Sequence, residues 1–408
     1  MYKKLIKQIG DIMRHINIKG IISFGLIFIF LSSFSVPTLA DGTPEPASSS
    51  IQTTGEIKVN AKSYIVMEAT TGQILSENAS NEKMPVSYLV KLMTLLLTME
   101  VIKSNKLNME TMLSTSKYAN SMGDPQIWLN VGEKISVDEL IKSITIGNAN
   151  DGCVVLAEAI GVTENDFVKM MNTKAAELGM TNTNFNNCTG IDCDGQYSTA
   201  HDIAVIAKEL SKYDELVPYF TTWMTDVRGG NTNLVNTNLL VRNFNGITGM
   251  KAAASKAAGN CLVSTARRNN LNLICVMLNC NSSEQRFADA KALLNYSFGA
   301  NEMFVPMVSD EILQPLNIKG GEVPKLEITT ENKNGIVINK GTSSKIKVNA
   351  IFNEEVSAPI SKGDQIGTIQ FLNGDNVIYE TKLIAQNDVR KMTIQIAFNK
   401  LLDYLLKF

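Results

Sequence analysis

The chain has 408 residues, of which 44% are hydrophobic, enough for two or three domains that each have their own core. Its formal net charge is −2, with acidic and basic residues interspersed, so no strongly basic face indicates a nucleic-acid partner. Only two histidines occur, His15 and His201, and His15 lies in a segment that we expect to be removed. A histidine-based catalytic triad and a histidine-rich metal site are therefore nearly excluded, and no cofactor is expected.

The N-terminal segment 1–40 has the pattern of a secretory signal peptide. Basic residues precede the apolar run at 20–36, and the small residues Thr38 and Ala40 favour cleavage after Ala40. Because the apolar run approaches membrane-spanning length, an uncleaved anchor is the alternative. In both cases the body of the protein is expected to be exported, with residues 41–56, rich in Pro, Ser and Thr, as a linker.

The six cysteines are few for a secreted protein held together by disulfides. Cys153, Cys261 and Cys275 lie in apolar runs, which is typical of buried thiols. Cys188 and Cys193 lie in one predicted loop and could form a disulfide, which the sequence does not establish.

Residues 57–305 are predicted to form an α+β domain, with strands at both sequence ends and helices between them. Alternating apolar residues around a Gly turn indicate a β-hairpin first, and helical periodicity then dominates from about Val86 to Leu210. The main predicted elements are the hairpin at 62–78, helices at 136–146, 151–161 and 164–179, strands at 261–268 and 271–279, and a closing helix at 282–298.

The C-terminal part of the chain reads as two further pieces. Residues 311–390 alternate apolar and polar side chains, with turn signals such as Asn373-Gly374-Asp375, and predict a small antiparallel β domain. Residues 392–408 predict an amphipathic helix. At a chain end such a helix is typical of one that lies on a membrane surface; the alternative is a helix docked on the protein's own core.

Several stretches together are far more specific than any single motif: MEATTGQIL, QIWLNVGEKISVDELIKSI, NDGCVVLAE, AAELGMTNTNF, LVNTNLLVRNFNGITGMK and CLVSTARRNN. Their order resembles the D-alanyl-D-alanine carboxypeptidases among the low-molecular-mass penicillin-binding proteins, over almost the whole exported chain. The resemblance implies a β-lactamase/transpeptidase-like domain, in which an antiparallel sheet joins a helical subdomain, followed by a small all-β domain and a C-terminal helix. It also implies removal of the terminal D-alanine from peptidoglycan stem peptides through an acyl-serine intermediate that penicillins trap.

The family's first motif is S-x-x-K at a helix start, where the spacing places the serine hydroxyl beside the lysine amine. Aligning KLMT and Pro85 with this pattern puts Lys91 at the lysine position and Tyr88, rather than serine, at the nucleophile position. A phenol is bulkier than a seryl group and has a pKa of about 10, so Tyr88 is a poor nucleophile. Ser87, four residues before Lys91, is the alternative nucleophile, but we expect it to cap the helix.

The second motif, S-x-N, lies between helices, and its serine relays a proton to the leaving amine. Here it reads Asn148-Ala149-Asn150. Asn150 keeps the role of holding the substrate or the lysine, whereas the Asn148 amide cannot shuttle a proton at neutral pH.

The third motif, K-T-G, lies on a strand edge and binds the substrate carboxylate. Here Lys251 is followed by Ala252 and Ala253 in place of the threonine and the glycine. The chain thereby lacks a hydroxyl donor, and a methyl group lies where the peptide should approach the backbone.

Three altered motifs in a matching scaffold predict a catalytically inactive homologue. We expect it to be exported to the outer face of the cytoplasmic membrane and to have a binding or regulatory role at the cell wall. Expected partners are the membrane surface, through the C-terminal helix, and peptidoglycan stem peptides, bound weakly through Lys251, Asn150 and Lys91. The protein partner is not identified. The alternative is an active serine-type carboxypeptidase that uses Ser87 with Lys91.

Overall fold

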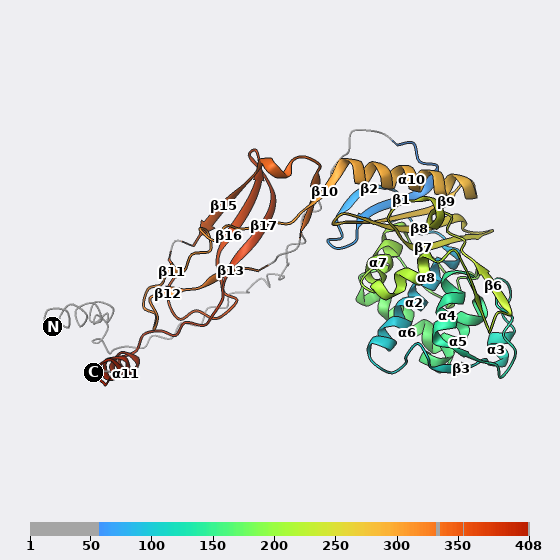
Figure 1. Cartoon of the computed structure of the whole chain (residues 1–408), viewed down its shortest axis with the longest axis horizontal. Coiled ribbons are helices and arrows are strands. Elements are labelled where there is room, and N and C mark those ends of the chain that lie inside the picture. The colour runs from blue at the N-terminus through green and yellow to red at the C-terminus, as the bar shows by residue number, and fades with distance from the viewer. Residues whose placement is uncertain (1–56, 332–334, 354, 407–408) are drawn as a thin grey trace, which may run out of the picture. The chain divides into compact units, whose positions relative to one another are not determined.

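The computed structural model of the chain describes residues 57–331, 335–353 and 355–406 (Figure 1). The predicted signal segment 1–40 and the linker 41–56 lie outside the described residues. Contacts divide the described chain into a larger unit, which runs to Met303 and includes Val337–Gly341, and a smaller unit, Phe304–Ile336 together with the chain from Thr342 onward.

The larger unit combines a five-stranded antiparallel sheet with many helices. Its strands are β1 (Ala61–Glu68), β2 (Ile74–Asn78), β3 (Met112–Ser114), β4 (Lys134–Ser136), β5 (Met224–Val227), β6 (Thr232–Val235), β7 (Ile247–Ser255), β8 (Gly259–Arg268), β9 (Leu271–Cys280), β10 (Asn301–Phe304) and β14 (Ile336–Asn339). Its helices are α2 (Lys91–Lys103), α3 (Lys117–Asn120), α4 (Val137–Thr145), α5 (Asn150–Gly161), α6 (Glu164–Glu177), α7 (Ala200–Leu210), α8 (Val217–Thr221), α9 (Leu240–Asn243) and α10 (Ser283–Ala300), with short 3-10 helices η1 (Ser87–Val90) and η2 (Asp214–Leu216).

The main sheet has the strand order β2-β1-β9-β8-β7, and every neighbouring pair is antiparallel. Helix α10 covers one face, and the other helices gather on the opposite side (Figure 1). The central strands β8 and β9 are buried almost throughout, because each face contributes to a separate hydrophobic core. Strand β7, which carries the K-T-G position, is an edge strand, as predicted.

The structure confirms the predicted α+β fold and its main elements. The hairpin at 62–78 is β1–β2, and the helices predicted at 136–146, 151–161, 164–179 and 282–298 are α4, α5, α6 and α10, with small differences at their ends. Helix α6 is followed by Gly179 at φ +74°, the left-handed conformation that glycine adopts at helix C-termini.

The smaller unit is an all-β domain followed by a helix, as predicted. It contains β11 (Leu316–Asn317), β12 (Lys325–Leu326), β13 (Ile328–Thr330), β15 (Ile346–Phe352), β16 (Gln365–Asn373), β17 (Asn376–Ala385), the 3-10 helix η3 (Ser343–Lys345) and α11 (Ile394–Leu405). Its four-stranded sheet, β13-β17-β16-β15, packs around buried residues such as Ile369 and Phe371. The β16–β17 hairpin turns at Gly374, where φ is +63°.

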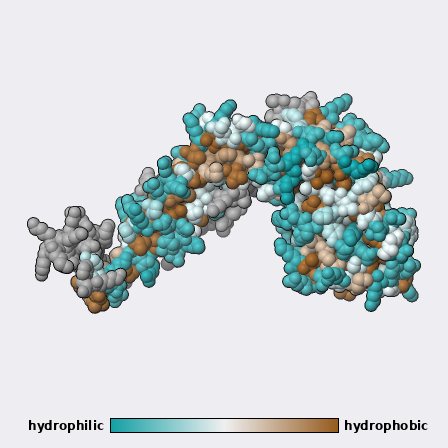
Figure 2. Space-filling model, viewed as in Figure 1, coloured by the Kyte–Doolittle hydropathy of each residue, from teal (hydrophilic) through white to brown (hydrophobic). Residues whose placement is uncertain are grey.

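The C-terminal helix α11 is capped by Thr393, whose side chain accepts from the Ile396 N–H, and none of its described residues is buried. Exposed apolar side chains on it include Phe398 and Leu405, and hydrophobic residues are visible on its surface in Figure 2. This exposure favours a surface helix over a helix docked on the protein's own core. Within the described ranges, no helix has both the length and the apolar character needed to cross a bilayer.

Candidate active site

The S-x-x-K position lies on η1, which leads directly into α2 at Lys91. Ser87 begins η1 with φ +49°, in the left-handed region. The loop at Gly190 crosses this turn so closely that a Cβ on Gly190 would lie 2.2 Å from the Ser87 carbonyl oxygen. Only glycine permits this approach, which holds the backbone of Ser87 and Tyr88 against the rest of the site.

Ser87 does not cap the helix, so that prediction is wrong. The residues at the N-cap positions are Val86 for η1 and Val90 for α2, and neither forms a side-chain cap. The intervening 3-10 turn moves the start of α2 four residues beyond Ser87, whereas a capping residue must directly precede the first turn. The Ser87 Oγ is buried and has no hydrogen-bond partner among the described residues.

Lys91 is fully buried, and its amine has internal partners. Its Nζ donates to Asn150 Oδ1 at 2.6 Å and to the Thr189 carbonyl, and it lies 4.5 Å from the centroid of the Tyr88 ring. Burial lowers the pKa of Lys91. Within the part of the chain that is described, no hydroxyl oxygen is among its hydrogen-bond partners.

Tyr88 presents its ring, and not its hydroxyl, to that amine. Its hydroxyl donates instead to the Asp124 carbonyl, at 3.5 Å. Burial raises the pKa of Tyr88, and the charges of Asp192 and Asp124 raise it further. The phenol therefore stays protonated at neutral pH, which is the opposite of what an activated nucleophile needs.

The S-x-N position lies where α4 is joined to α5: Asn148 and Ala149 lie in the turn, and Asn150 begins α5. Asn150 accepts from Lys91 and donates through Nδ2 to the Gly123 carbonyl at 2.9 Å, so both the oxygen and the nitrogen of its side-chain amide are hydrogen-bonded. Asn148 has φ +59° and donates to Thr237 Oγ1 at 3.2 Å, while its Oδ1 is buried without a partner among the described residues. Asn148, which the sequence places at the serine position of the motif, has no hydrogen bond to Lys91.

Lys251 on β7 is fully buried and points at the end of a helix. Its Nζ donates to the carbonyls of Ile144 at 2.5 Å and Thr145 at 3.4 Å, where α4 ends. These carbonyls carry the partial negative charge of a helix C-terminus, which favours a cation. Burial and, to a lesser degree, the charge of Lys91 lower the pKa of Lys251 to about 7. Ala252 and Ala253 are buried too.

The structure brings all three motifs together. Lys91 bonds Asn150 directly, and Asn148 is linked to the strand through Thr237, whose hydroxyl donates to the Ala252 carbonyl at 3.3 Å. The lysines of the first and third motifs are close enough for each to affect the other's charge, as the shift of Lys251 indicates.

Sequence reasoning missed several groups that shape this site. Arg286 on α10 donates to the carbonyls of Ala253 at 2.6 Å and Cys261 at 3.1 Å, and so fixes the edge strand from behind. The Thr189 carbonyl, a partner of Lys91, belongs to a loop that is far from Lys91 in the sequence. A backbone carbonyl carries no side-chain signal, so no sequence pattern marks it.

All six cysteines are free thiols, so Cys188 and Cys193 do not pair. Cys188 is buried and Cys193 is exposed. Among the described residues, no three His, Cys, Asp or Glu side chains converge on a common point as a metal site requires.

Comparisons with known proteins agree with this geometry. Residues 50–282 match the family model described as D-alanyl-D-alanine carboxypeptidase, and residues 302–391 match that of the penicillin-binding protein 5 C-terminal domain. The D-alanyl-D-alanine carboxypeptidase DacF of Bacillus subtilis is 34% identical over 379 residues, which is 91% of this chain and 95% of DacF. DacC of Escherichia coli is 28% identical over 345 residues, 82% of this chain and 86% of DacC.

The fold has relatives among solved structures. Penicillin-binding protein 5 from Haemophilus influenzae superposes with a TM-score of 0.77 at 24% identity, covering 83% of this chain and 100% of that one. At 24% identity this similarity shows the fold alone. The family is shown by the match to the family model, which covers more than half of the chain. The chain belongs to the D-alanyl-D-alanine carboxypeptidase family of peptidoglycan metabolism.

Proposed function

We propose that this chain is a catalytically inactive member of the family, with a binding or regulatory role at the cell wall. The observation that supports this most directly is the environment of Lys91. Its amine has an amide oxygen, a backbone carbonyl and the ring of Tyr88 as neighbours, and no hydroxyl that it could deprotonate. Acyl transfer by this family needs a hydroxyl nucleophile beside that amine.

The alternative, an active carboxypeptidase that uses Ser87, has less support. The Ser87 Oγ has no hydrogen bond to Lys91 and is buried under the loop that contains Gly190. A nucleophile must lie within hydrogen-bond reach of its base, at about 2.6–3.2 Å, and an attack from Ser87 would require η1 to refold.

Weak binding of stem peptides through Lys251, Asn150 and Lys91 stays a prediction. All three side chains are buried and already bonded inside the protein. A peptide carboxylate would have to displace the α4 carbonyls from Lys251 before it could bind there. A binding role therefore depends on groups outside the three motifs.

We further propose that the chain is exported and held at the outer face of the cytoplasmic membrane. The N-terminal signal pattern and the exposed apolar side chains of α11 support this. The proposed organisation is 57–305 for the carboxypeptidase-like domain, 311–390 for the β domain and 392–408 for the membrane-associating helix. The change of unit after Met303 is in keeping with the first boundary.

Fluorescent penicillin tests the proposal. The purified chain should show no covalent label after gel electrophoresis, while Listeria monocytogenes penicillin-binding protein D2, whose solved structures include an ampicillin-bound form, serves as the positive control. A labelled band that disappears in Ser87→Ala would instead establish the active alternative.

A further inference from the structure

Residues 123–134, which we call the Trp128 loop, border the former catalytic site. The loop's carbonyls at Gly123 and Pro125 accept from Asn150, the latter from its N–H at 2.7 Å, and the Asp124 carbonyl accepts from Tyr88. The loop is therefore tied to the same residues that hold Lys91, on the side where Tyr88 is partly exposed.

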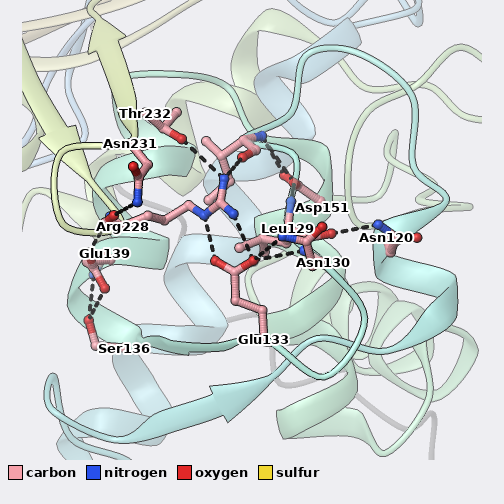
Figure 3. Close-up of polar contacts among 11 residues, drawn as sticks. Asn120, Leu129, Asn130, Glu133, Ser136, Glu139, Asp151, Arg228, Asn231 and Thr232 are labelled. Atoms are coloured by element: carbon pink, nitrogen blue, oxygen red, sulfur yellow. Dashed lines mark hydrogen bonds and ion pairs between the residues drawn. The ribbon is translucent and has the colours of Figure 1, made fainter.

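A buried carboxylate fixes the backbone on both sides of Trp128. Asp151, at the start of α5, is fully buried and accepts from the N–H groups of Ile127 and Leu129 at 3.1 Å (Figure 3). It also accepts from the Gly152 N–H at 2.9 Å. A buried carboxylate is stable only when such donors surround it, so the loop and the carboxylate hold each other in place.

An ion pair fixes the same loop from the other side. Arg228 donates to both oxygens of Glu133, at 2.6 and 2.8 Å, and to the Ile127 carbonyl at 2.8 Å. Asn120 donates to the Leu129 carbonyl at 2.7 Å. Figure 3 shows these side chains converging on the loop from separate elements. Such a bidentate pair imposes geometry as well as attraction.

Trp128 itself differs from its well-bonded neighbours in its exposure and its backbone conformation. Its side chain is 63% exposed and its φ is +54°. A single exposed apolar residue is normal on a protein surface. A bulky residue in the left-handed region, however, costs about 1–3 kcal/mol and persists only where surrounding contacts enforce it. Here those contacts fix the backbone that carries a large, exposed indole.

We infer that Trp128 is a binding platform for a sugar ring of the peptidoglycan glycan strand. The face of an indole is electron-rich, and the face of a pyranose ring presents C–H groups polarised by the neighbouring oxygens, so the two stack. Asn130 and Glu133 of the loop are bonded to each other, and Glu133 also to Arg228, whereas the indole is the loop's largest exposed apolar side chain. A rigid indole binds at little entropic cost.

The inference rests on the proposed binding role at the cell wall and deepens it. With Lys91, Asn150 and Lys251 buried, a contact to the wall requires an exposed group, and Trp128 supplies one beside the site. A protein partner that uses Trp128 as an anchor is a different hypothesis, which the experiment below separates from this one.

Fluorescence offers a direct test, because the chain has only two tryptophans. In Trp223→Phe, Trp128 is the sole indole; the other tryptophan, Trp223, lies 5.0 Å from the Arg242 guanidinium. Titration of full-length Trp223→Phe with the β-1,4-linked trimer of N-acetylglucosamine should give a saturable change in Trp128 emission. A free stem peptide without sugar should give none.

Retention on insoluble peptidoglycan provides the second measurement. Trp128→Gly removes the indole and suits the left-handed backbone, so it should fold and be retained at least about tenfold more weakly than the parent, while Trp128→Tyr keeps an aromatic face and most of the retention. Unchanged emission with the trimer, equal retention of Trp128→Gly, or a response to the stem peptide alone would each overturn the inference. Penicillin labelling of the same samples reports separately on the proposed inactivity.

Discussion

The catalytic positions and the Trp128 loop are neighbours in space, yet they differ in how many of their buried polar groups have hydrogen-bond partners. In the loop, Asp151 and Arg228 each have several well-placed partners. At the catalytic positions, Ser87 Oγ and Asn148 Oδ1 are buried without a partner among the described residues, and Lys251 is bonded to a helix end.

If the chain is inactive as proposed, this difference favours the Trp128 loop as the part that binds. Buried polar atoms without partners cost about 1–3 kcal/mol each and are usually retained only where chemistry needs them. The proposed inactivity removes that need at Ser87 and Asn148. The loop, in contrast, combines the bonded groups of Asp151, Glu133 and Arg228 with one exposed indole on a strained backbone, which is the combination that the proposed binding role expects.

Restoring the motifs should have the largest effect. Combining Tyr88→Ser, Asn148→Ser, Ala252→Thr and Ala253→Gly returns a hydroxyl to the face of Lys91 that the Tyr88 ring now covers. We expect penicillin labelling and D-alanine release to appear, because loss of a catalytic nucleophile alone costs about a millionfold in rate. The same variant with Lys91→Met is the control, and equal labelling of the two would contradict the assignment of Lys91 as the base.

Breaking the ion pair of the loop should have the next largest effect. Arg228→Met leaves Glu133 without its bidentate partner and the Ile127 carbonyl without a donor, so the free energy of unfolding should fall by about 2–3 kcal/mol, measured by urea denaturation. Lys169→Met, which removes an exposed ion pair with Asp166, is the matched control and should change little. Similar losses in both variants would mean that the loop network is no stronger than a surface pair.

The buried lysine of β7 predicts a pH effect. Because the folded pKa of Lys251 is about 7 and its ordinary value is 10.5, the unfolded chain keeps its proton to higher pH than the folded chain. The free energy of unfolding should therefore rise between about pH 7 and pH 9, by about 2 kcal/mol from this group. Lys251→Met should reduce that rise; an unchanged pH dependence would show that folding does not lower the pKa of Lys251.

Relief of backbone strain should have the smallest effect. Val162, 84% exposed, has φ +69° and ψ −41°, a conformation that strains a β-branched residue. Val162→Gly should raise the free energy of unfolding by about 1 kcal/mol. Val131→Gly is the control: it is exposed and not among the residues with positive φ, so it should lower stability instead. This pair shows whether strain of the kind seen at Trp128 has a measurable cost in this protein.

Much of the fold was predictable because it depends on local patterns. The hairpin at 62–78 and helices α4, α5 and α6 follow from alternation and helical spacing, which reflect burial on one face. The element locations also followed in large part: Lys91 begins α2, Lys251 lies on the edge strand β7, and Asn150 begins α5 directly after the turn in which it was expected. The predicted cap at Ser87 failed because a 3-10 turn, packed under Gly190, precedes α2.

The sequence alone determined the family and the order of the elements, since residue identity and periodicity suffice for both. The placement of Tyr88 at the nucleophile position stays a prediction from the motif spacing. Only the tertiary structure decided where the side chains point. Lys251 faces the carbonyls of α4, Lys91 faces the ring of Tyr88, and Asp151 and Arg228 hold the Trp128 loop. These contacts join residues far apart in the chain, and burial and hydrogen bonding select them only when the elements pack together.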